Sequence, residues 1–101
     1  MTNHTEEELA DLQKRALEES SQPPKHLLAK ATIRKVLEPC GDYISDETIY
    51  HILLVCGGNL YRATHKCILA LQAEAFKTRN IILKKISREL LKKHEAGLLL
   101  P

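Results

Sequence analysis

The chain has 101 residues, a formal net charge of +2, no Trp and one Phe. This length predicts one domain with one modest core, which leaves little room for a deep substrate cleft. Three cysteines cannot all pair within one chain, the N-terminus is too polar for a signal peptide, and the apolar runs are too short to cross a bilayer. We therefore expect an intracellular protein without a membrane segment.

The first 22 residues are acidic, with six carboxylates against Lys14 and Arg15. Thr5 and Glu8 have the spacing of a capping box, and an apolar stripe follows at helical spacing through about residue 19. The stripe consists of Leu9, Leu12, Ala16 and Leu17. We expect a weakly amphipathic, peripheral helix here, followed by a linker over 20–24.

Pro23 and Pro24 disfavour helix just before them and can start a new helix from its first turn. The pattern that follows predicts a helix over 25–38 that ends in a turn over 39–42. Its expected inner face comprises Leu27, Leu28, Ala31 and Leu37, together with Ile33 or Val36.

The stretch 45–71 predicts two helices joined by a two-glycine break. Ser45 is a good N-cap, Asp46 and Glu47 suit the positive end of a helix dipole, and Ile44 is placed to staple onto Ile49. The expected inner face of this helix comprises Ile49, Ile52, Leu53 and Cys56.

Gly57 and Gly58 can adopt left-handed backbone angles that stop the first helix, and Asn59 can cap the second. The inner face of the second helix is expected to be Leu60, Ala63, Cys67, Ile68 and Leu71. We expect it to fold back on the first helix, so that the two form the antiparallel pair at the centre of the fold.

Beyond Phe76 two interpretations remain open. Asn80 can cap a separate helix, whereas nothing over 77–80 forbids one continuous helix from Leu60 to Ala96. Segment 77–95 is in both cases basic and amphipathic, with seven Lys and Arg against two Glu. Its apolar positions are Ile81, Ile82, Leu83, Ile86, Leu90 and Leu91.

Gly97 is expected to end the last helix, which leaves an apolar tail over 98–101. Two interpretations of this tail are open: its leucines fold back onto the protein's own core, or they anchor a partner.

Residues capable of catalysis or metal binding do not form a pattern typical of a site. The five histidines are scattered and no CxxC pair is present, so solvated histidines and core cysteines are expected in place of zinc ligands. Cys40 lies in a predicted turn, not far in sequence from Asp42 and His51, which is weak support for a nucleophile. Because Cys56 and Cys67 lie on expected inner faces, Cys40 should react first with a thiol reagent.

The helix, break and second helix also have the layout of a helix-turn-helix unit. Asn59, Arg62, His65 and Lys66 would then lie on the outer face of the second helix, and the later basic helix would track phosphates. DNA binding is therefore one alternative function.

Two protein families resemble this stretch more closely. Ile44-Ser45-Asp46-Glu47, Gly57-Gly58-Asn59-Leu60-Tyr61-Arg62-Ala63 and Ala70-Leu71 together resemble the small helical head-tail adaptor (head-completion) proteins of tailed phages. In those proteins a capped helix meets a Gly-Gly-Asp/Asn break and then a long Ala-rich helix. The resemblance implies a virion protein that forms a ring on the portal vertex and links the DNA-filled head to the tail.

Gly58-Asn59 and Ala63 also resemble the last helix start of ubiquitin-binding modules of the CUE or UBA kind. Their signature Met-Phe-Pro or Gly-Phe turn has no equivalent here, because Glu38-Pro39-Cys40 stands in its place. Ubiquitin binding is the other alternative function.

We expect an all-α protein of four or five helices: an acidic N-terminal part (1–24), a helical core (25–97) and an apolar tail (98–101). The expected function is that of a non-enzymatic head-tail adaptor in the neck of a phage particle, with no cofactor, metal or small-molecule substrate. Its expected partners are other copies of itself and a portal or neck protein, with DNA as a secondary contact. The expected partner-binding residues are Leu98, Leu99, Leu100, Arg79, Lys84, Lys85, Arg88, Lys92 and Lys93, and the structural break is Gly57, Gly58 and Asn59.

Overall fold

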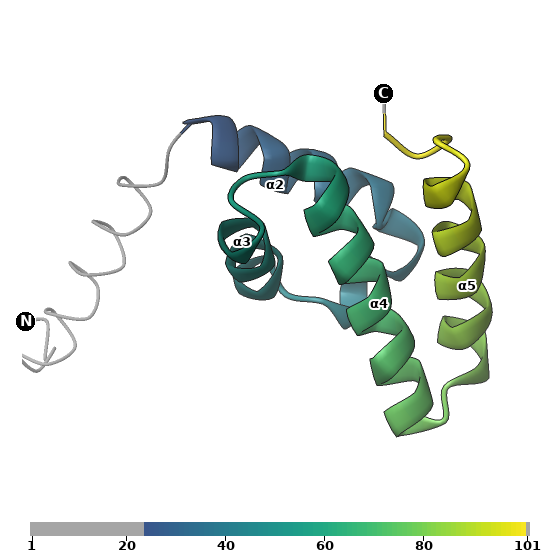
Figure 1. The fold of residues 1–101 in the computed structure, drawn as a ribbon. Coiled ribbons are helices and arrows are strands. Elements are labelled where there is room, and N and C mark those ends of the chain that lie inside the picture. The colour runs from purple at the N-terminus through teal and green to yellow at the C-terminus, as the bar shows by residue number, and fades with distance from the viewer. Residues whose placement is uncertain (1–23, 101) are drawn as a thin grey trace, which may run out of the picture.

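In the computed structural model, which describes residues 24–100, the chain forms an all-α fold, as predicted (Figure 1). Its elements are α2 (Pro24–Val36), the 3-10 helix η1 (Glu38–Tyr43), α3 (Asp46–Val55), α4 (Leu60–Thr78) and α5 (Ile81–Glu95). The acidic helix predicted over 5–19 lies outside the described residues. None of the helices within 24–100 is long and apolar enough to span a bilayer.

Helix α2 begins at Pro24, as the proline pattern predicts, but its inner face differs from the expected one. Ile33 is buried, as is Leu37 just beyond the helix, whereas Leu28 is 72% exposed and Leu27 is also exposed. The prediction of Leu27, Leu28 and Ala31 as inner residues was therefore wrong. In the first half of α2, Ala29 packs against the core whereas Leu27 and Leu28 remain exposed, so the inner face is displaced from the expected one.

The ends of α3 follow the predicted capping. The Ser45 hydroxyl accepts a hydrogen bond from the Thr48 N–H, and Ile44 and Ile49 are both buried in the core. At the other end, Gly57 and Gly58 have φ angles of 63° and 80°. The Gly57 and Gly58 N–H groups donate to the carbonyls of Leu54 and Leu53, which is the Schellman pattern of helix termination.

Helices α4 and α5 are separate, so the interpretation of one continuous helix from Leu60 to Ala96 was wrong. The Asn80 side chain caps α5 by accepting a hydrogen bond from the Leu83 N–H. The Arg79 N–H donates to the Phe76 carbonyl and the Asn80 N–H to the Ala75 carbonyl, which again makes a Schellman ending. Arg79 takes the left-handed position of this motif, with φ 54° and ψ 37°.

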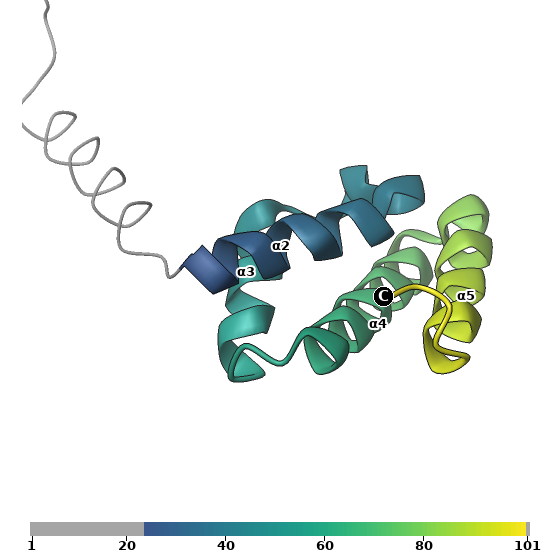
Figure 2. The ribbon, with the colours of Figure 1, turned by 90° about the horizontal axis from the view of Figure 1, so that it is seen from above.

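The antiparallel pair of this fold is formed by α4 and α5, which lie side by side along most of their length (Figure 1). We expected that pair on either side of Gly57-Gly58; instead α3 is seen nearly end-on where α4 is seen from the side, so the two helices cross steeply (Figure 1). Helices α2 and α3 form one side of the molecule and the α4–α5 hairpin forms the other (Figure 2). The two glycines therefore redirect the chain between the two halves of the fold.

The core lies where these two halves meet. Most of the predicted inner residues of α3 and α4 are in it, whereas Ile52, Cys56 and Leu60 are only partly buried against it. The structure adds Cys40 from η1 and Ala75 from α4. Its fully or nearly buried apolar side chains are Ile33, Leu37, Cys40, Ile44, Ile49, Leu53, Ala63, Cys67, Ile68, Leu71, Ala75, Leu83 and Leu90. The small residues Ala63, Cys67 and Ala75 on α4 leave room for close helix packing.

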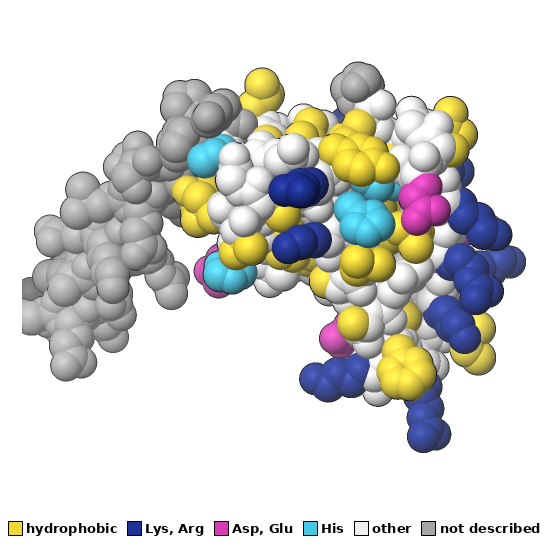
Figure 3. Space-filling model, viewed as in Figure 1, with side chains coloured by type: hydrophobic (Ala, Val, Ile, Leu, Met, Phe, Trp, Pro, Cys, Tyr) yellow, Lys and Arg dark blue, Asp and Glu magenta, His cyan; other side chains and the backbone are white. Residues whose placement is uncertain are grey.

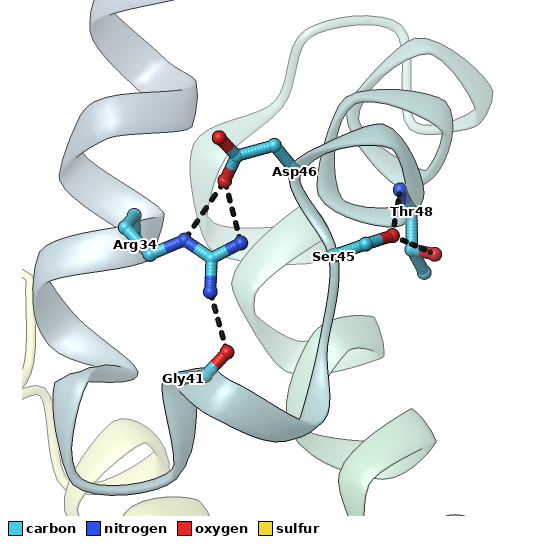
Figure 4. A network of polar contacts seen from close by, with 5 residues as sticks. All are labelled: Arg34, Gly41, Ser45, Asp46 and Thr48. Carbon is cyan, nitrogen blue, oxygen red and sulfur yellow. Dashed lines mark hydrogen bonds and ion pairs between the residues drawn. The ribbon is translucent and has the colours of Figure 1, made fainter.

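Arg34 fastens α2 to the start of α3 (Figure 4). Its Nε and Nη2 atoms lie 2.9 and 2.5 Å from Asp46 Oδ1, and Nη1 donates to the Gly41 carbonyl oxygen over 2.6 Å. The planar guanidinium of this α2 residue thus connects α2 to both η1 and α3. Because both side chains are partly exposed, the ion pair itself contributes only about 0–1 kcal/mol. Its effect is mainly to set the path of η1.

Candidate interaction surface

Helix α5 has two opposite faces of different chemistry. Leu83, Ser87, Leu90 and His94 are buried against the rest of the fold. Ile81, Lys85, Arg88 and Lys92 follow the same spacing, displaced by two residues, and all four are exposed. Since a displacement of two residues is about 200° around a helix, these four residues form a line on the outer face. We call Lys85, Arg88 and Lys92 the basic ridge.

The turn between α4 and α5 presents apolar side chains to solvent. Phe76 is 85% exposed, Ile81 80% and Ile82 71%. Phe76 and Ile81 line the same shallow depression, together with Lys77, Arg79 and Lys84. We call Phe76, Ile81 and Ile82 the tip patch.

Hydrophobic and basic side chains lie beside one another at this end of the hairpin, and basic side chains continue along α5 (Figure 3). All of Lys77, Arg79, Lys84 and Lys85 are exposed around the tip patch. Arg34 and Asp46 form the one ion pair among residues 24–100. The Lys and Arg side chains of α5 therefore have no carboxylate partner within these residues. The surface is therefore both apolar and positively charged, which suits an acidic partner with apolar side chains.

The structure places the predicted partner-binding residues at two ends of one helix. Arg79, Lys84 and Lys85 lie near the tip, whereas Leu98, Leu99 and Leu100 follow the opposite end of α5. Leu98 is 74% exposed, but Leu99 is partly buried and packs against the core. Lys92 and Lys93, in the last turn of α5, lie closer to the tail than to the tip.

The residues of the helix-turn-helix interpretation lie at the start of α4. Asn59 is committed to capping α4, because its Oδ1 accepts a hydrogen bond from the Arg62 N–H. Arg62 and Lys66 are exposed and line an open depression with Tyr61, His65 and the end of α3. Arg62 and Lys66 thus form a second pair of bases, at the opposite end of α4 from the tip patch, and Glu95 of α5 lines the same depression.

Two expectations about titratable residues were wrong. His94 was expected in solvent but is 1% exposed, and burial lowers its pKa. Cys40 was expected to be the accessible thiol, yet it is buried, and burial raises its pKa. Burial also raises the pKa of Cys67 to about 12, whereas Cys56 is only half-buried. Among the described residues no three His, Cys, Asp or Glu side chains are grouped as metal ligands.

Sequence reasoning missed the tip patch because it counted every apolar residue of 81–91 toward one inner stripe. Because Asn80 caps α5, Ile81 and Ile82 are its first two residues. The buried face of α5 begins at Leu83 and continues through Ser87, Leu90 and His94, so neither isoleucine belongs to it. Phe76 is the single Phe of the chain and is followed by Lys77 and Arg79, and an aromatic residue close to an arginine is a signal that sequence reasoning could have used for an interface.

Comparisons with protein-family models, curated proteins and solved structures found no match to this chain.

Proposed function

We propose that this protein is a non-enzymatic assembly protein, an adaptor that joins protein subunits through the tip patch and the basic ridge. The observation that supports this proposal is the exposed Phe76, which lines one depression together with Ile81 and the bases Lys77, Arg79 and Lys84.

The energetics favour a protein partner at the tip. Fully burying a Phe or Ile side chain contributes roughly 1.5–3 kcal/mol, and here three such side chains contribute little to the fold's own stability. Single exposed apolar residues are ordinary, but an aromatic residue and two isoleucines among Lys and Arg are typical of a binding surface. The capping bonds of Asn80 and the Arg79 turn hold the patch on a defined backbone, so little ordering entropy opposes binding.

The kind of adaptor follows from the family resemblance. Segment 44–71 resembles the head-tail adaptors of tailed phages, which implies a ring on the portal vertex in the virion neck, assembled in the host cytoplasm. Two features behind that resemblance have structural roles here: the Ser45 side chain caps α3, and the two left-handed glycines join the two halves of the fold. In this proposal α2 and α3 support the hairpin, and the hairpin contacts the portal or a neighbouring subunit.

Negative-stain imaging of the purified protein mixed with portal protein tests the proposal. We expect extra density on the portal ring, and its loss in the double variant Phe76→Ser, Ile81→Ser. The matched control is Leu28→Ser, Leu54→Ser, which removes two exposed apolar side chains far from the tip. Both variants should keep the wild-type helical signal and melting temperature. Attachment that survives the tip variant, or that the control abolishes, would contradict the proposal.

Nucleic-acid binding is the second candidate, since the basic ridge has no carboxylate partner among residues 24–100. It predicts tight binding of free duplex DNA that weakens steeply with salt. A gel-shift series with Lys85→Glu, Arg88→Glu and with Arg62→Glu, Lys66→Glu would show which pair of bases is used. A titration with ubiquitin tests the remaining alternative, and micromolar ubiquitin binding would overturn the adaptor proposal.

A further inference from the structure

The surface formed by the tip patch and the basic ridge has a specific requirement for its occupant. Four bases surround the tip patch, and Arg88 and Lys92 continue the charge along α5. An occupant must therefore bring several carboxylates together with apolar side chains that cover Phe76 and Ile81.

The chain itself contains such a segment. Residues 5–19, outside the described part, hold Glu6, Glu7, Glu8, Asp11, Glu18 and Glu19. The same segment holds Leu9, Leu12, Ala16 and Leu17, whose spacing places them on one side of a helix. Its charge is opposite to that of the hairpin, and the amphipathic pattern offers an apolar side for the tip patch.

We infer that the acidic segment 5–19 of one copy docks on the tip patch and basic ridge of a second copy, in a head-to-tail contact. This inference rests on the proposed assembly function and names one partner of the proposed surface.

The topology favours a second copy over the same chain. The ridge lies on the outer face of α5, away from α4, while α2 starts on the other side of the molecule (Figure 2). Only residues 20–23 separate the acidic segment from Pro24, and four residues span at most about 14 Å. A contact with a neighbouring copy needs no path around the fold. Because such a contact is heterologous, its repetition closes into a ring when the rotation between copies permits.

Charge reversal in matched pairs tests the inference, with association measured by light scattering on the full chain. The hairpin variant is Lys85→Glu, Arg88→Glu and the N-terminal variant is Glu7→Lys, Asp11→Lys. Each alone should associate about tenfold or more weakly than wild type, because like charges then face each other. An equimolar mixture of the two should associate again, since each copy then finds a complementary face. The control Arg62→Glu, Lys66→Glu carries the same charge change and should associate like wild type.

Salt and neutral variants complete the test. Association of the wild type should weaken at about 1 M salt, where charges are screened within about 3 Å. If a reversed variant loses helical signal, Lys85→Gln, Arg88→Gln replaces it and should show a smaller loss of association.

The outcomes separate this inference from the proposed function. A monomeric wild type, or a mixture of reversed variants that fails to associate, overturns the head-to-tail contact; attachment to portal protein would then stand by itself. Self-association that both reversals abolish and their mixture restores, without any attachment to portal, supports the contact and contradicts the adaptor role.

Discussion

His94 stacks on Tyr61, with ring centroids 4.1 Å apart, and its Nε2 donates a hydrogen bond to the Tyr61 carbonyl oxygen over 3.1 Å. The contact joins the last turn of α5 to the first turn of α4, so it closes the open end of the hairpin. His94 Nδ1 is buried without a hydrogen-bond partner among the described residues. A neutral ring, protonated at Nε2, fits this arrangement, because a proton on Nδ1 would be buried without an acceptor.

We expect the stability of the fold to fall in mild acid through His94. Burial lowers its pKa below 6.5; the Tyr61 hydrogen bond and Glu95 oppose this shift, and His65 at 5.9 Å adds to it. The unfolded chain therefore binds a proton first as pH falls through about 6.5, and the free energy of unfolding decreases below that pH. At higher pH the histidine is neutral in both states and this pH dependence is absent.

Melting temperatures across about pH 5 to 8 measure this effect. His94→Gln should flatten the pH dependence, whereas His51→Gln, which changes an exposed histidine, should leave it unchanged. An unchanged slope in His94→Gln would show that other groups cause the acid sensitivity.

Arg79→Gly should stabilise the protein. Arg79 is the one non-glycine residue with a positive φ within 24–100. A left-handed conformation costs a residue with a Cβ roughly 1–2 kcal/mol, and glycine avoids this cost. Glycine also loses more backbone entropy on folding, which offsets part of the gain. We expect a net gain of about 0.5–1 kcal/mol and a melting temperature a few degrees higher. The control Lys77→Gly, inside the last turn of α4, should instead lower the melting temperature. A lower melting temperature for Arg79→Gly would contradict the left-handed turn assigned to Arg79.

Gly58 should tolerate substitution less well than Gly57. Both have a positive φ, but a Cβ on Gly58 would lie 3.0 Å from His26 Nε2, whereas a Cβ on Gly57 would meet nothing within 4 Å. Gly58→Val should cost well over 1 kcal/mol, because a β-branched residue fits neither the backbone nor the space. Chemical denaturation of Gly57→Ala and Gly58→Ala gives the comparison at equal side-chain size. Equal losses would mean that His26 moves away without cost.

Cys56 should be the first thiol to react in the native protein, because Cys40 and Cys67 are buried and burial raises the pKa of both. The thiolate is the reactive form, so both burial and the raised pKa slow labelling. Mass spectrometry after brief exposure to a thiol reagent identifies the labelled position. Labelling of Cys40 before Cys56 would show that η1 opens readily.

Local signals allowed most of the helix boundaries to be predicted. Ser45, Asn59 and the two glycines act on their own neighbours through caps and backbone angles, and each occurs where the sequence indicates. The Arg79 turn was left open because a left-handed arginine has no sequence signature and is stable only through its place in the Schellman motif.

The faces of the helices were harder to predict than their ends. Leu28 is as apolar as Leu37, and only the way α2 crosses the core leaves the first exposed and the second buried. Cys40 is buried for the same reason, since η1 turns it inward although its neighbours are typical of a surface turn. Predicting the tip patch required knowing both that Asn80 caps α5 and which side of α5 faces the core. The second depends on long-range packing, which the local sequence does not contain.

The tail over 98–100 should stabilise the fold through Leu99 and leave Leu98 free. Leu99 is partly buried against the core, whereas Leu98 is 74% exposed. Leu99→Ser should therefore lower stability by about 1 kcal/mol, roughly half the value for a fully buried leucine, and Leu98→Ser should change it by less than about 0.5 kcal/mol.

Deleting residues 98–101 should lower the melting temperature as Leu99→Ser does. If the truncated protein melts like the wild type, the packing of Leu99 contributes nothing to stability. If Leu98→Ser alone removes attachment to portal protein at an unchanged melting temperature, the exposed leucine is a second anchor beside the tip patch.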